Sequence, residues 1–388
     1  LGTNSTFANI GDPNSNNLPA ESCKTGGVYT GGVYIQDCIA ADSPSHTIGT
    51  VTFGTDGSLF VSSGDGAHFN FTDPRALRAL SVDSLNGKIL RIDPVTGEGY
   101  PDNPFYNGDP NSNRSKVYSL GLRNPFRTTI NTLTNEPFIG DVGYNTWEEL
   151  NTGRGKNFGW PCYEGNNVGS AQQPGYKNLA ATSATCNALY AQGLGAVQAP
   201  IHAYDHSQGA SAIQAGGFYR GTVYPAQYQG ALFFSDYNAD WIHYLTFDAN
   251  GVATKFDFGT DVSPVGGLVQ LLIRPHTNLY YVAYNGPTPN TSEIRRIRYT
   301  AGGNTPPTAN ASADPTSGYV PLTVNFSSLG SFDPDVQVLT YAWNFGDGIT
   351  STSPNPSHIY TTGGTFTATL TISDSQGATG SDVVSVTV

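Results

Sequence analysis

The feature that most constrains this chain is a pair of short strands joined by a tight turn in residues 45–66. Apolar residues stand among polar ones at Ile48, Val51 and Phe53, which predicts a first strand, and the apolar run Leu59-Phe60-Val61 predicts a second. Between them lies Thr55-Asp56-Gly57, whose final glycine favours a hairpin turn. Alternation at period two is typical of strands that bury one face. The chain is therefore expected to be built from small antiparallel sheets.

The second half of this unit recurs along the chain. In each recurrence a short apolar strand is followed, after a loop of variable length, by a second strand. The pairs are residues 59–65 with 88–93, 137–141 with 147–150, 231–236 with 241–245, and 279–282 with 294–297. Repeated antiparallel pairs predict a β-propeller, whose blades are small sheets around an axis. The four recognisable units predict an all-β fold.

Composition supports this fold class and excludes some partners. The 388 residues include 46 glycines and 25 prolines, which favours a loop-rich β protein with room for at least two domains. The net charge of −12, with scattered basic residues, argues against nucleic acid and membrane surfaces as partners. No apolar run is long enough to span a bilayer. With no methionine, and ending inside an alternating strand, the chain is expected to be a piece of a longer secreted protein.

The sequence divides into four segments of different character. Residues 1–45 are loop-rich, and residues 46–300 carry the repeated strand pairs. Residues 301–307 form a linker rich in glycine and proline. Residues 308–388 alternate at period two between turn glycines, which predicts a small Ig-like β-sandwich with Trp343 in its core.

The cysteines and glycosylation motifs indicate a compartment. Four cysteines allow three pairings, and the local pairs Cys23–Cys38 and Cys162–Cys186 are expected because each closes a short loop. Disulfides predict a secreted, extracellular, cell-surface or periplasmic protein; the alternative is four free thiols. Exposed Asn-x-Ser/Thr motifs are candidate glycosylation sites, and six begin at Asn4, Asn70, Asn113, Asn290, Asn310 and Asn325.

One histidine and one aspartate flank the first strand pair. His46 immediately precedes the first strand, and Asp65 follows the second. Because a short antiparallel pair brings its outer ends together, the two side chains are expected to meet at one rim. A carboxylate can fix the tautomer and orientation of an imidazole, as a general base requires. The alternative is that His46 is a solvated loop residue and Asp65 a turn former.

The densest polar chemistry lies in residues 116–165. Carboxylates, amides and glycine carbonyls in loops are ligands that calcium uses, although the spacing is not that of an EF-hand. The alternative is a network of buried hydrogen bonds and ion pairs that orders a long loop. A second polar group comprises His202, Tyr204, Asp205 and His206. We expect these residues to lie in a loop and not to form a transition-metal site.

Two resemblances to known families rest on these motifs. Residues 306–309, 321–324, 331–335 and 341–348 resemble a PKD-type Ig-like domain, which implies an extracellular spacer or adhesion module. Residues 46–300 resemble the glucose/sorbosone dehydrogenase family of six-bladed propellers. That resemblance rests on Ser45-His46, residues 53–57, Gly64-Asp65-Gly66, and residues 87–91, 121–125, 148–151 and 157–161.

The second resemblance implies a cofactor and a set of roles. The family oxidises sugars with pyrroloquinoline quinone (PQQ) and calcium. His46 matches the base that takes a proton from the sugar C1 hydroxyl, and Asp65 matches the carboxylate that orients this base. Arg123 matches a residue near quinone and substrate, and Asn124 matches a cofactor contact. The calcium ligands are matched by the carbonyls of Gly143 and Tyr144, with Glu148 and Glu149 as acidic residues of a nearby calcium site.

The sequence also departs from the family. Where the family has a quinone-binding lysine, the nearest match is Arg220. The family also has an Arg-x-Arg pair, and the corresponding positions in this chain fall near Gly267 and Val269. The first family blades are largely absent before His46, so the ring is expected to be incomplete in this chain or completed by another piece.

Two functions from different classes follow. The first is a secreted aldose dehydrogenase acting at C1 with PQQ and calcium. The alternative is a non-catalytic extracellular adhesion, matrix or filament-forming glycoprotein, whose open propeller edge pairs with another chain by strand addition. A carbohydrate-binding module with aromatic rims is a third. The expected partners are a sugar or cell-surface glycan, and a second chain at the propeller edge or the PKD-type domain.

Overall fold

The computed structural model describes residues 23–25, 32–43, 45–166, 169–209, 212–260, 267–273, 278–284, 292–297, 299, 304–334 and 337–388. The chain divides into two compact units, Leu1–Tyr299 (unit 1) and Thr300–Val388 (unit 2). Both units are built mainly from β-strands with a few short helices, so the all-β prediction is confirmed.

Unit 1 contains a series of small sheets whose neighbouring strands pair antiparallel. The first sheet is β3 (Ile48–Phe53), β4 (Leu59–Ser63), β5 (Lys88–Ile92) and β6 (Val117–Leu120). The second is β7 (Pro125–Asn131), β8 (Glu136–Asp141), β9 (Trp147–Thr152) and β12 (His202–Asp205). The third is β13 (Ile213–Phe218), β14 (Leu232–Asp236), β15 (Trp241–Phe247) and β16 (Ala253–Thr260). The fourth is β17 (Gly267–Ile273), β18 (Leu279–Tyr284) and β19 (Glu293–Ile297).

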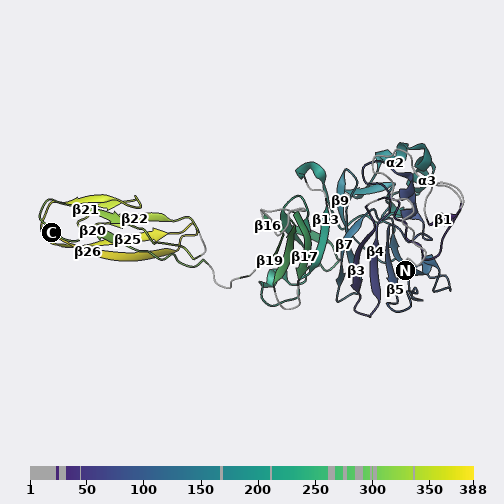
Figure 1. Cartoon of the computed structure of the whole chain (residues 1–388), viewed down its shortest axis with the longest axis horizontal. Helices are drawn as coiled ribbons and strands as arrows, with labels where there is room; N and C mark the ends of the chain where they lie inside the picture. Colours follow the sequence, from purple (N-terminus) through teal and green to yellow (C-terminus); the bar gives the residue numbers. More distant parts are fainter. Residues whose placement is uncertain are drawn as a thin grey trace. The chain divides into compact units, whose positions relative to one another are not determined.

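These sheets are the blades of a propeller. Their first strands β3, β7, β13 and β17 pack against one another in chain order, and Figure 1 shows the sheets following one another through unit 1. Apolar side chains fill the space between neighbouring blades; Phe60 and Ile139 share one cluster, and Phe138 and Phe234 share the next. The strand pairs recognised in the sequence are the second and third strands of the blades.

Two segments without a recognised sequence pattern are regular, and the first of them was expected to be a loop. Residues 202–205 form β12, which pairs with β9 as the outer strand of the second blade. Its sequence signal is weak because only Ala203 is fully buried. The polar segment after residue 166 contains α2 (Pro174–Asn178) and α3 (Ala180–Tyr190). Tyr176 and a disulfide at Cys186 hold these helices in a small core, and no long amphipathic pattern announces them.

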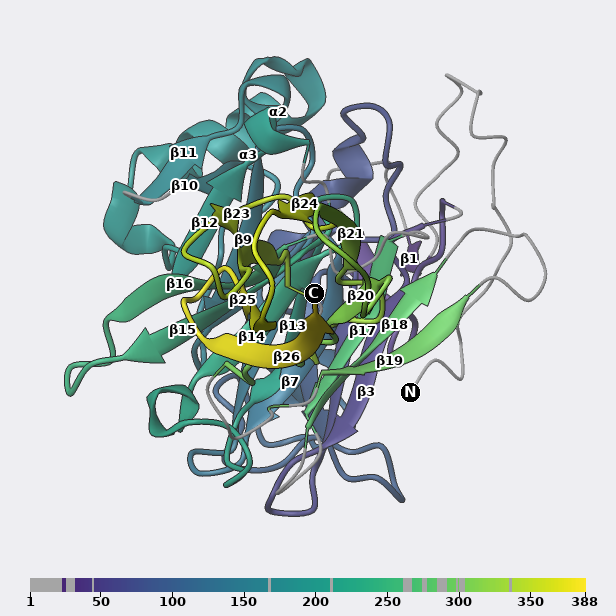
Figure 2. The same ribbon diagram turned by 90° about the vertical axis from the view of Figure 1, so that its left-hand side faces the viewer.

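Shorter elements complete unit 1. One of these is the 3₁₀ helix η1 (Pro74–Leu80). The remaining elements are β1 (Lys24–Thr25), β2 (Val33–Tyr34), α1 (Asn113–Lys116), β10 (Tyr163–Asn166), β11 (Gly169–Gln172), η2 (Leu194–Ala196), η3 (His206–Gln208) and η4 (Ala226–Tyr228). Figure 2 shows α2 and α3 gathered with β10 and β11 at one end of the sheets. Within the described ranges, no helix is long and apolar enough to cross a membrane.

Both expected disulfides are confirmed. Cys23 pairs with Cys38, and Cys162 pairs with Cys186. The glycosylation motifs differ in exposure. Asn113 is buried, and its side-chain amide donates hydrogen bonds to the carbonyls of Ile35 and Asp83, so this motif is not accessible. The motifs at Asn70, Asn310 and Asn325 are exposed, and those at Asn4 and Asn290 lie outside the described residues.

Unit 2 is a β-sandwich. One sheet consists of β20 (Ser312–Asp314), β21 (Leu322–Ser327) and β24 (Ser357–Tyr360). The other consists of β22 (Thr340–Asn344), β23 (Thr350–Ser351), β25 (Thr365–Ser373) and β26 (Thr379–Thr387). Trp343 is buried in the core between them with Phe326 and Phe345, as the sequence predicts.

Strand direction decides which residues share a rim of unit 1. Ile48 at the start of β3 pairs with Ser63 at the end of β4, and Pro125 at the start of β7 pairs with Asp141 at the end of β8. His46, Asp65 and Asn124 therefore gather at the rim where these strand ends meet, which we call the site rim. The turn between β7 and β8 lies at the opposite rim.

Candidate active site

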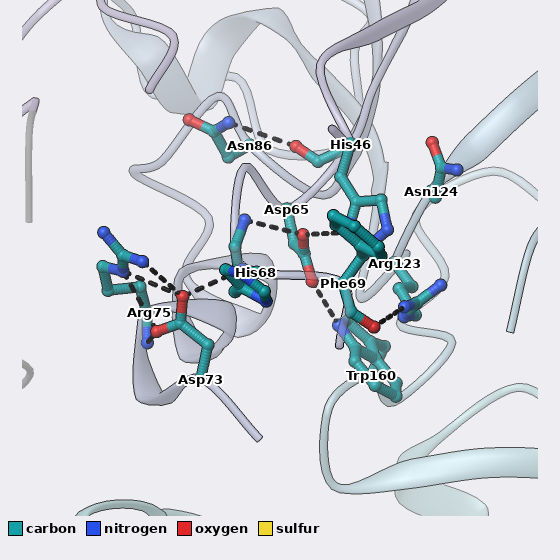
Figure 3. A network of polar contacts seen from close by, with 12 residues as sticks. His46, Asp65, His68, Phe69, Asp73, Arg75, Asn86, Arg123, Asn124 and Trp160 are labelled. Atoms are coloured by element: carbon teal, nitrogen blue, oxygen red, sulfur yellow. Dashed lines mark hydrogen bonds and ion pairs between the residues drawn. The ribbon is translucent and has the colours of Figure 1, made fainter. Parts of the chain in front are cut away.

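His46 and Asp65 meet at the site rim, as the sequence predicts. Nδ1 of His46 lies 2.9 Å from Oδ1 of Asp65, and both side chains are buried (Figure 3). Among the described residues, no group forms a hydrogen bond with the other imidazole nitrogen, Nε2. The pair therefore leaves one histidine nitrogen available for a ligand, and the alternative of a solvated loop histidine is wrong.

The backbone brings the pair together through close contacts. Gly64 donates to the carbonyl of Thr47 at 2.7 Å, and Gly66 donates to the carbonyl of His46 at 3.0 Å. A Cβ on Gly64 would lie 2.4 Å from the carbonyl oxygen of His46, so only glycine allows this approach. The Asn86 side chain donates to the carbonyl of Gly64 at 3.1 Å and fixes the strand end before Asp65.

Both oxygens of Asp65 accept hydrogen bonds. Oδ1 accepts from the backbone amide of Ala67 at 2.9 Å as well as facing His46. Oδ2 accepts from the indole Nε1 of Trp160 at 2.8 Å (Figure 3). Trp160 lies 95 residues away in the chain, so only the tertiary fold brings its indole to this carboxylate.

The charges around the pair favour a neutral imidazole beside an ionised carboxylate. Burial, and then the positive charge of Arg123, lower the pKa of His46, although Asp65 opposes this. Burial alone would raise the pKa of Asp65. The interaction with His46, the charge of Arg123 and the hydrogen bond from Ala67 together outweigh burial and lower this pKa. An ionised Asp65 accepts a hydrogen bond from the Nδ1–H of His46, and the lone pair of Nε2 remains basic.

Arg123 is the cation of the site. Its Nη1 donates to the carbonyls of Val142 at 3.1 Å and Gly143 at 2.5 Å, and its Nη2 lies 3.4 Å from the carbonyl of Phe69. The guanidinium also lies over the rings of Tyr144 and Trp160, at 5.4 and 5.5 Å. In the described part of the chain, no carboxylate forms an ion pair with this buried side chain. A buried cation without an anion suits a negatively charged ligand.

Asn124 follows Arg123 at the same rim. Its backbone amide donates to Oδ1 of Asp141 at 2.7 Å, and the amide of Arg123 donates to Oδ2 of the same carboxylate at 3.0 Å. Asp141 therefore fixes the backbone that carries both predicted site residues. The side-chain amide of Asn124 forms no hydrogen bond with any described residue, so it is available to a ligand.

The four residues predicted to hold calcium do not converge. The carbonyl of Gly143 already accepts from Arg123. Glu148 and Glu149 are neighbours in β9 and point to opposite faces, as strand geometry requires. Glu148 contacts Nε2 of His206 at 2.8 Å, whereas Glu149 accepts from the amides of Asn151 and Gly165. The backbone amide of Tyr144 donates to Glu164 at 2.7 Å.

Residues 141–164, which we call the acidic segment, instead form a network of buried hydrogen bonds, which was the alternative to a calcium site. Asp141, Glu148, Glu149 and Glu164 are buried, and each accepts from nearby N–H donors. Burial, followed by the proximity of Glu149, raises the pKa of Asp141 well above its usual value. Burial raises the pKa of Glu149 to about 7. Across the described ranges, no group of three or more His, Cys, Asp or Glu residues is arranged to hold a metal ion.

Arg220 is not brought to the site rim. It follows β13, which begins near Glu148 at the site rim and ends at the opposite rim. There the Arg220 guanidinium donates to the side-chain oxygen of Asn131, the last residue of β7, at 2.8 Å. The prediction that Arg220 contacts the cofactor alongside Asn124 is therefore wrong, because the six-residue strand β13 separates the two rims.

Sequence reasoning assigned no role to two residues of this region. Trp160 stands in the Asn-Phe-Gly-Trp-Pro motif that supported the family resemblance, and that motif was the available signal. Arg127 in β7 donates from Nε to the carbonyl of Val269 at 3.1 Å, beside the position of the family's arginine pair. No sequence signal connects Arg127 to Val269, which lies 142 residues away in the chain.

Comparisons with known proteins identify a family for each unit. The family described as glucose/sorbosone dehydrogenase matches residues 32–262, and the PKD domain family matches residues 304–388. The HIPL2 protein of Arabidopsis thaliana is 33% identical over 221 residues, covering 51% of this chain and 29% of the relative. Aldose sugar dehydrogenase YliI of Escherichia coli is 32% identical over 118 residues, covering 30% of this chain and 29% of the relative.

The fold has a solved counterpart. A glucose dehydrogenase structure superposes with a TM-score of 0.52 at 21% identity, covering 70% of this chain and 68% of that one, which shows a shared fold. The chain thus spans less than a third of the length of the curated relatives named above. With a family match across most of unit 1 and a second match across unit 2, the chain belongs to the glucose/sorbosone dehydrogenase family and continues into a PKD domain.

Proposed function

We propose that unit 1 is a sugar dehydrogenase that oxidises the C1 hydroxyl of an aldose, with His46 as the general base. The observation that carries this proposal is the 2.9 Å contact between His46 and Asp65 at the site rim. Oxidation of this hydroxyl to a lactone carbonyl removes a proton from oxygen and a hydride from carbon. Nε2 of His46 takes the proton, and Asp65 stabilises the imidazolium that forms.

Arg123 supports this chemistry through its charge. Burial, and then the charge of Arg123, lower the pKa of His46, which keeps the imidazole neutral before reaction. A sugar hydroxyl that loses its proton next to His46 develops negative charge on oxygen, and a preorganised guanidinium nearby stabilises that charge. The rings of Tyr144 and Trp160 and the backbone carbonyls already hold Arg123, so little reorganisation is needed.

The residues at the site rim fit the quinone of the family. PQQ carries carboxylates, and Arg123 is a buried cation without a carboxylate partner in the described residues. Asn124 adds an unused side-chain amide. Arg127 is a second cation, which donates to the carbonyls of Val269 and Phe126, lies 3.9 Å from the centre of the Phe126 ring, and forms no ion pair with a carboxylate among the described residues. When bound, PQQ would supply the two-electron acceptor for the hydride. Calcium does not fit the ligand set predicted for it, because the Gly143 carbonyl already accepts from Arg123, and Glu148 and Glu149 point to opposite faces of β9.

The direct test is a titration of the purified chain with PQQ, followed by its absorbance, with and without calcium. Dye reduction with a panel of aldoses then measures turnover. We expect stoichiometric binding and turnover that is lost in His46→Gln, while Asp93→Asn, at an exposed turn, behaves as the wild type. Turnover that persists in His46→Gln would contradict the assignment of the base. Binding that requires calcium would show that the acidic segment rearranges.

A second candidate function is a non-catalytic extracellular protein that assembles through unit 1. The observation that favours it is the outer face of β3, where Val51 is 57% and Phe53 is 64% exposed. Two disulfides and a PKD domain support an extracellular, cell-surface or periplasmic location for either function. Self-association by sedimentation, together with no PQQ binding at micromolar concentration, would favour this candidate over the dehydrogenase.

A further inference from the structure

Trp160 connects the two charged groups of the site. Its indole Nε1 donates to Oδ2 of Asp65 at 2.8 Å, and the face of its ring lies 5.5 Å from the guanidinium carbon of Arg123. The side chain is only 4% exposed. Figure 3 shows the indole below Asp65, joined to one carboxylate oxygen, while the other oxygen faces His46.

We propose that Trp160 is a positioning residue that locks the Asp65 carboxylate in the orientation in which it holds His46. This inference rests on the proposed function, since the orientation matters because His46 is the base. A carboxylate held at one oxygen can rotate about its Cβ–Cγ bond. Oδ1 is shared by His46 and the amide of Ala67, whereas the indole is the one hydrogen-bond donor to Oδ2 among the described residues.

The indole also moderates how strongly Asp65 attracts a proton. A hydrogen bond to a carboxylate favours its ionised form and spreads its charge. Asp65 is fully buried, so this donor replaces a water molecule that would otherwise solvate Oδ2. With the donor present, Asp65 orients the imidazole without binding the imidazolium too tightly. Without it, the more concentrated charge on Asp65 stabilises protonated His46, and the pKa of His46 rises.

Trp160 is itself held rigidly, as a positioning residue must be. Its ring packs edge-on against Tyr176, with ring centroids 5.1 Å apart. Two residues later, Cys162 is bonded to Cys186 in α3, and all four residues share one buried cluster. The indole therefore presents its N–H to Asp65 from a packed core and not from a mobile loop.

The first test is Trp160→Phe, which keeps an aromatic face for Arg123 and removes the N–H. We expect kcat to fall at least tenfold, and by no more than the ~10²–10⁴ that a general base contributes, with little change in KM. The limb of the kcat–pH profile that reports His46 should move to higher pH. Trp241→Phe, in the third blade, is the matched control and should change neither kcat nor the position of this limb. A limb that stays in place while only thermal stability falls would overturn the proposal.

A second test needs no turnover and separates this inference from the proposed function. NMR of protein with ¹⁵N-labelled Trp and His reports the indole N–H of Trp160 and the titration of His46, which Arg123, Asp65 and His68 face. We expect the Trp160 N–H signal to shift in Asp65→Asn, and the pKa of His46 to rise in Trp160→Phe. The Asp65→Asn arm remains valid even if Trp160→Phe does not fold.

The two failures have different signatures. A wild type that oxidises no aldose but shows both NMR effects contradicts the dehydrogenase and leaves the positioning of Asp65 established. An active wild type whose Trp160 N–H signal does not respond to Asp65→Asn contradicts the role of Trp160 and leaves the dehydrogenase standing.

Discussion

Nδ1 of His46 lies 2.9 Å from Oδ1 of Asp65, although nineteen residues separate them in the chain. The two side chains flank the same end of one strand pair, β3 and β4, so strand pairing brings them close. Trp160 and Arg123, which complete the site, come from the following blade and its long connection, so the site is assembled from local and distant parts.

Asp65→Asn should abolish most turnover. An asparagine amide can donate to Nδ1 of His46 and so favours the tautomer in which Nε2 carries the proton and cannot act as a base. We expect kcat to fall by about 10²–10⁴, with a smaller change in KM. Steady-state dye reduction measures this, with Asp93→Asn as the control. Near-normal kcat would mean that Asp65 does not orient the base.

Arg123→Gln should weaken quinone binding. A charge-assisted hydrogen bond contributes about 1.5–3 kcal/mol, which corresponds to an increase in Kd of about 10- to 150-fold. Arg127→Gln should act in the same direction if that side chain also faces the ligand. Arg220→Gln is the matched control, because Arg220 lies at the opposite rim with Asn131. Equal losses in Arg123→Gln and Arg220→Gln would contradict the location of the site.

The contact between the second and third blades should be sensitive to acid. Burial, and then the charge of Lys255, lower the pKa of both His202 and His243 to about 4. Since an unfolded histidine titrates near 6.5, the unfolded chain binds more protons between about pH 6.5 and 4. The free energy of unfolding of unit 1 should therefore fall as the pH drops through this window.

Urea unfolding followed by the fluorescence of Trp241, which stacks on His243 at 3.8 Å, measures this effect. The double variant His202→Gln/His243→Gln should flatten the pH dependence. His206 gives a contrast of opposite sign, because its hydrogen bond with Glu148 raises its pKa. His206→Gln should remove stability that is present at low pH and lost as the pH rises. An unchanged slope in the double variant would rule out these histidines as the cause.

The disulfide between Cys162 and Cys186 should affect both stability and turnover. It closes a loop between residues 24 apart, and removing such a crosslink costs about 2–5 kcal/mol. Cys162→Ser/Cys186→Ser should lower the urea midpoint and also kcat, because Trp160 lies in the same buried cluster. Cys23→Ser/Cys38→Ser should lower stability and leave kcat intact. Equal effects of the two double variants on kcat would disconnect the first disulfide from the site.

Several parts of this architecture could be read from the sequence because they depend on local patterns. Period-two alternation and turn glycines identify the inner strands of the blades and the sandwich of unit 2. The outer strand β12 escaped detection because it is short and half-exposed. Helices α2 and α3 escaped detection because a disulfide and the buried Tyr176 hold them, with no amphipathic face of their own.

By itself, the sequence determined the fold class, the disulfides and the pairing of His46 with Asp65, since each arises from short-range spacing within one hairpin or loop. Tertiary structure alone decided that the Trp160 indole donates to Asp65 and that Arg123 donates to the carbonyl of Gly143. It also decided that Arg220 lies at the opposite rim. The physical reason is that strand direction and blade packing, and not distance along the chain, set which side chains share a rim.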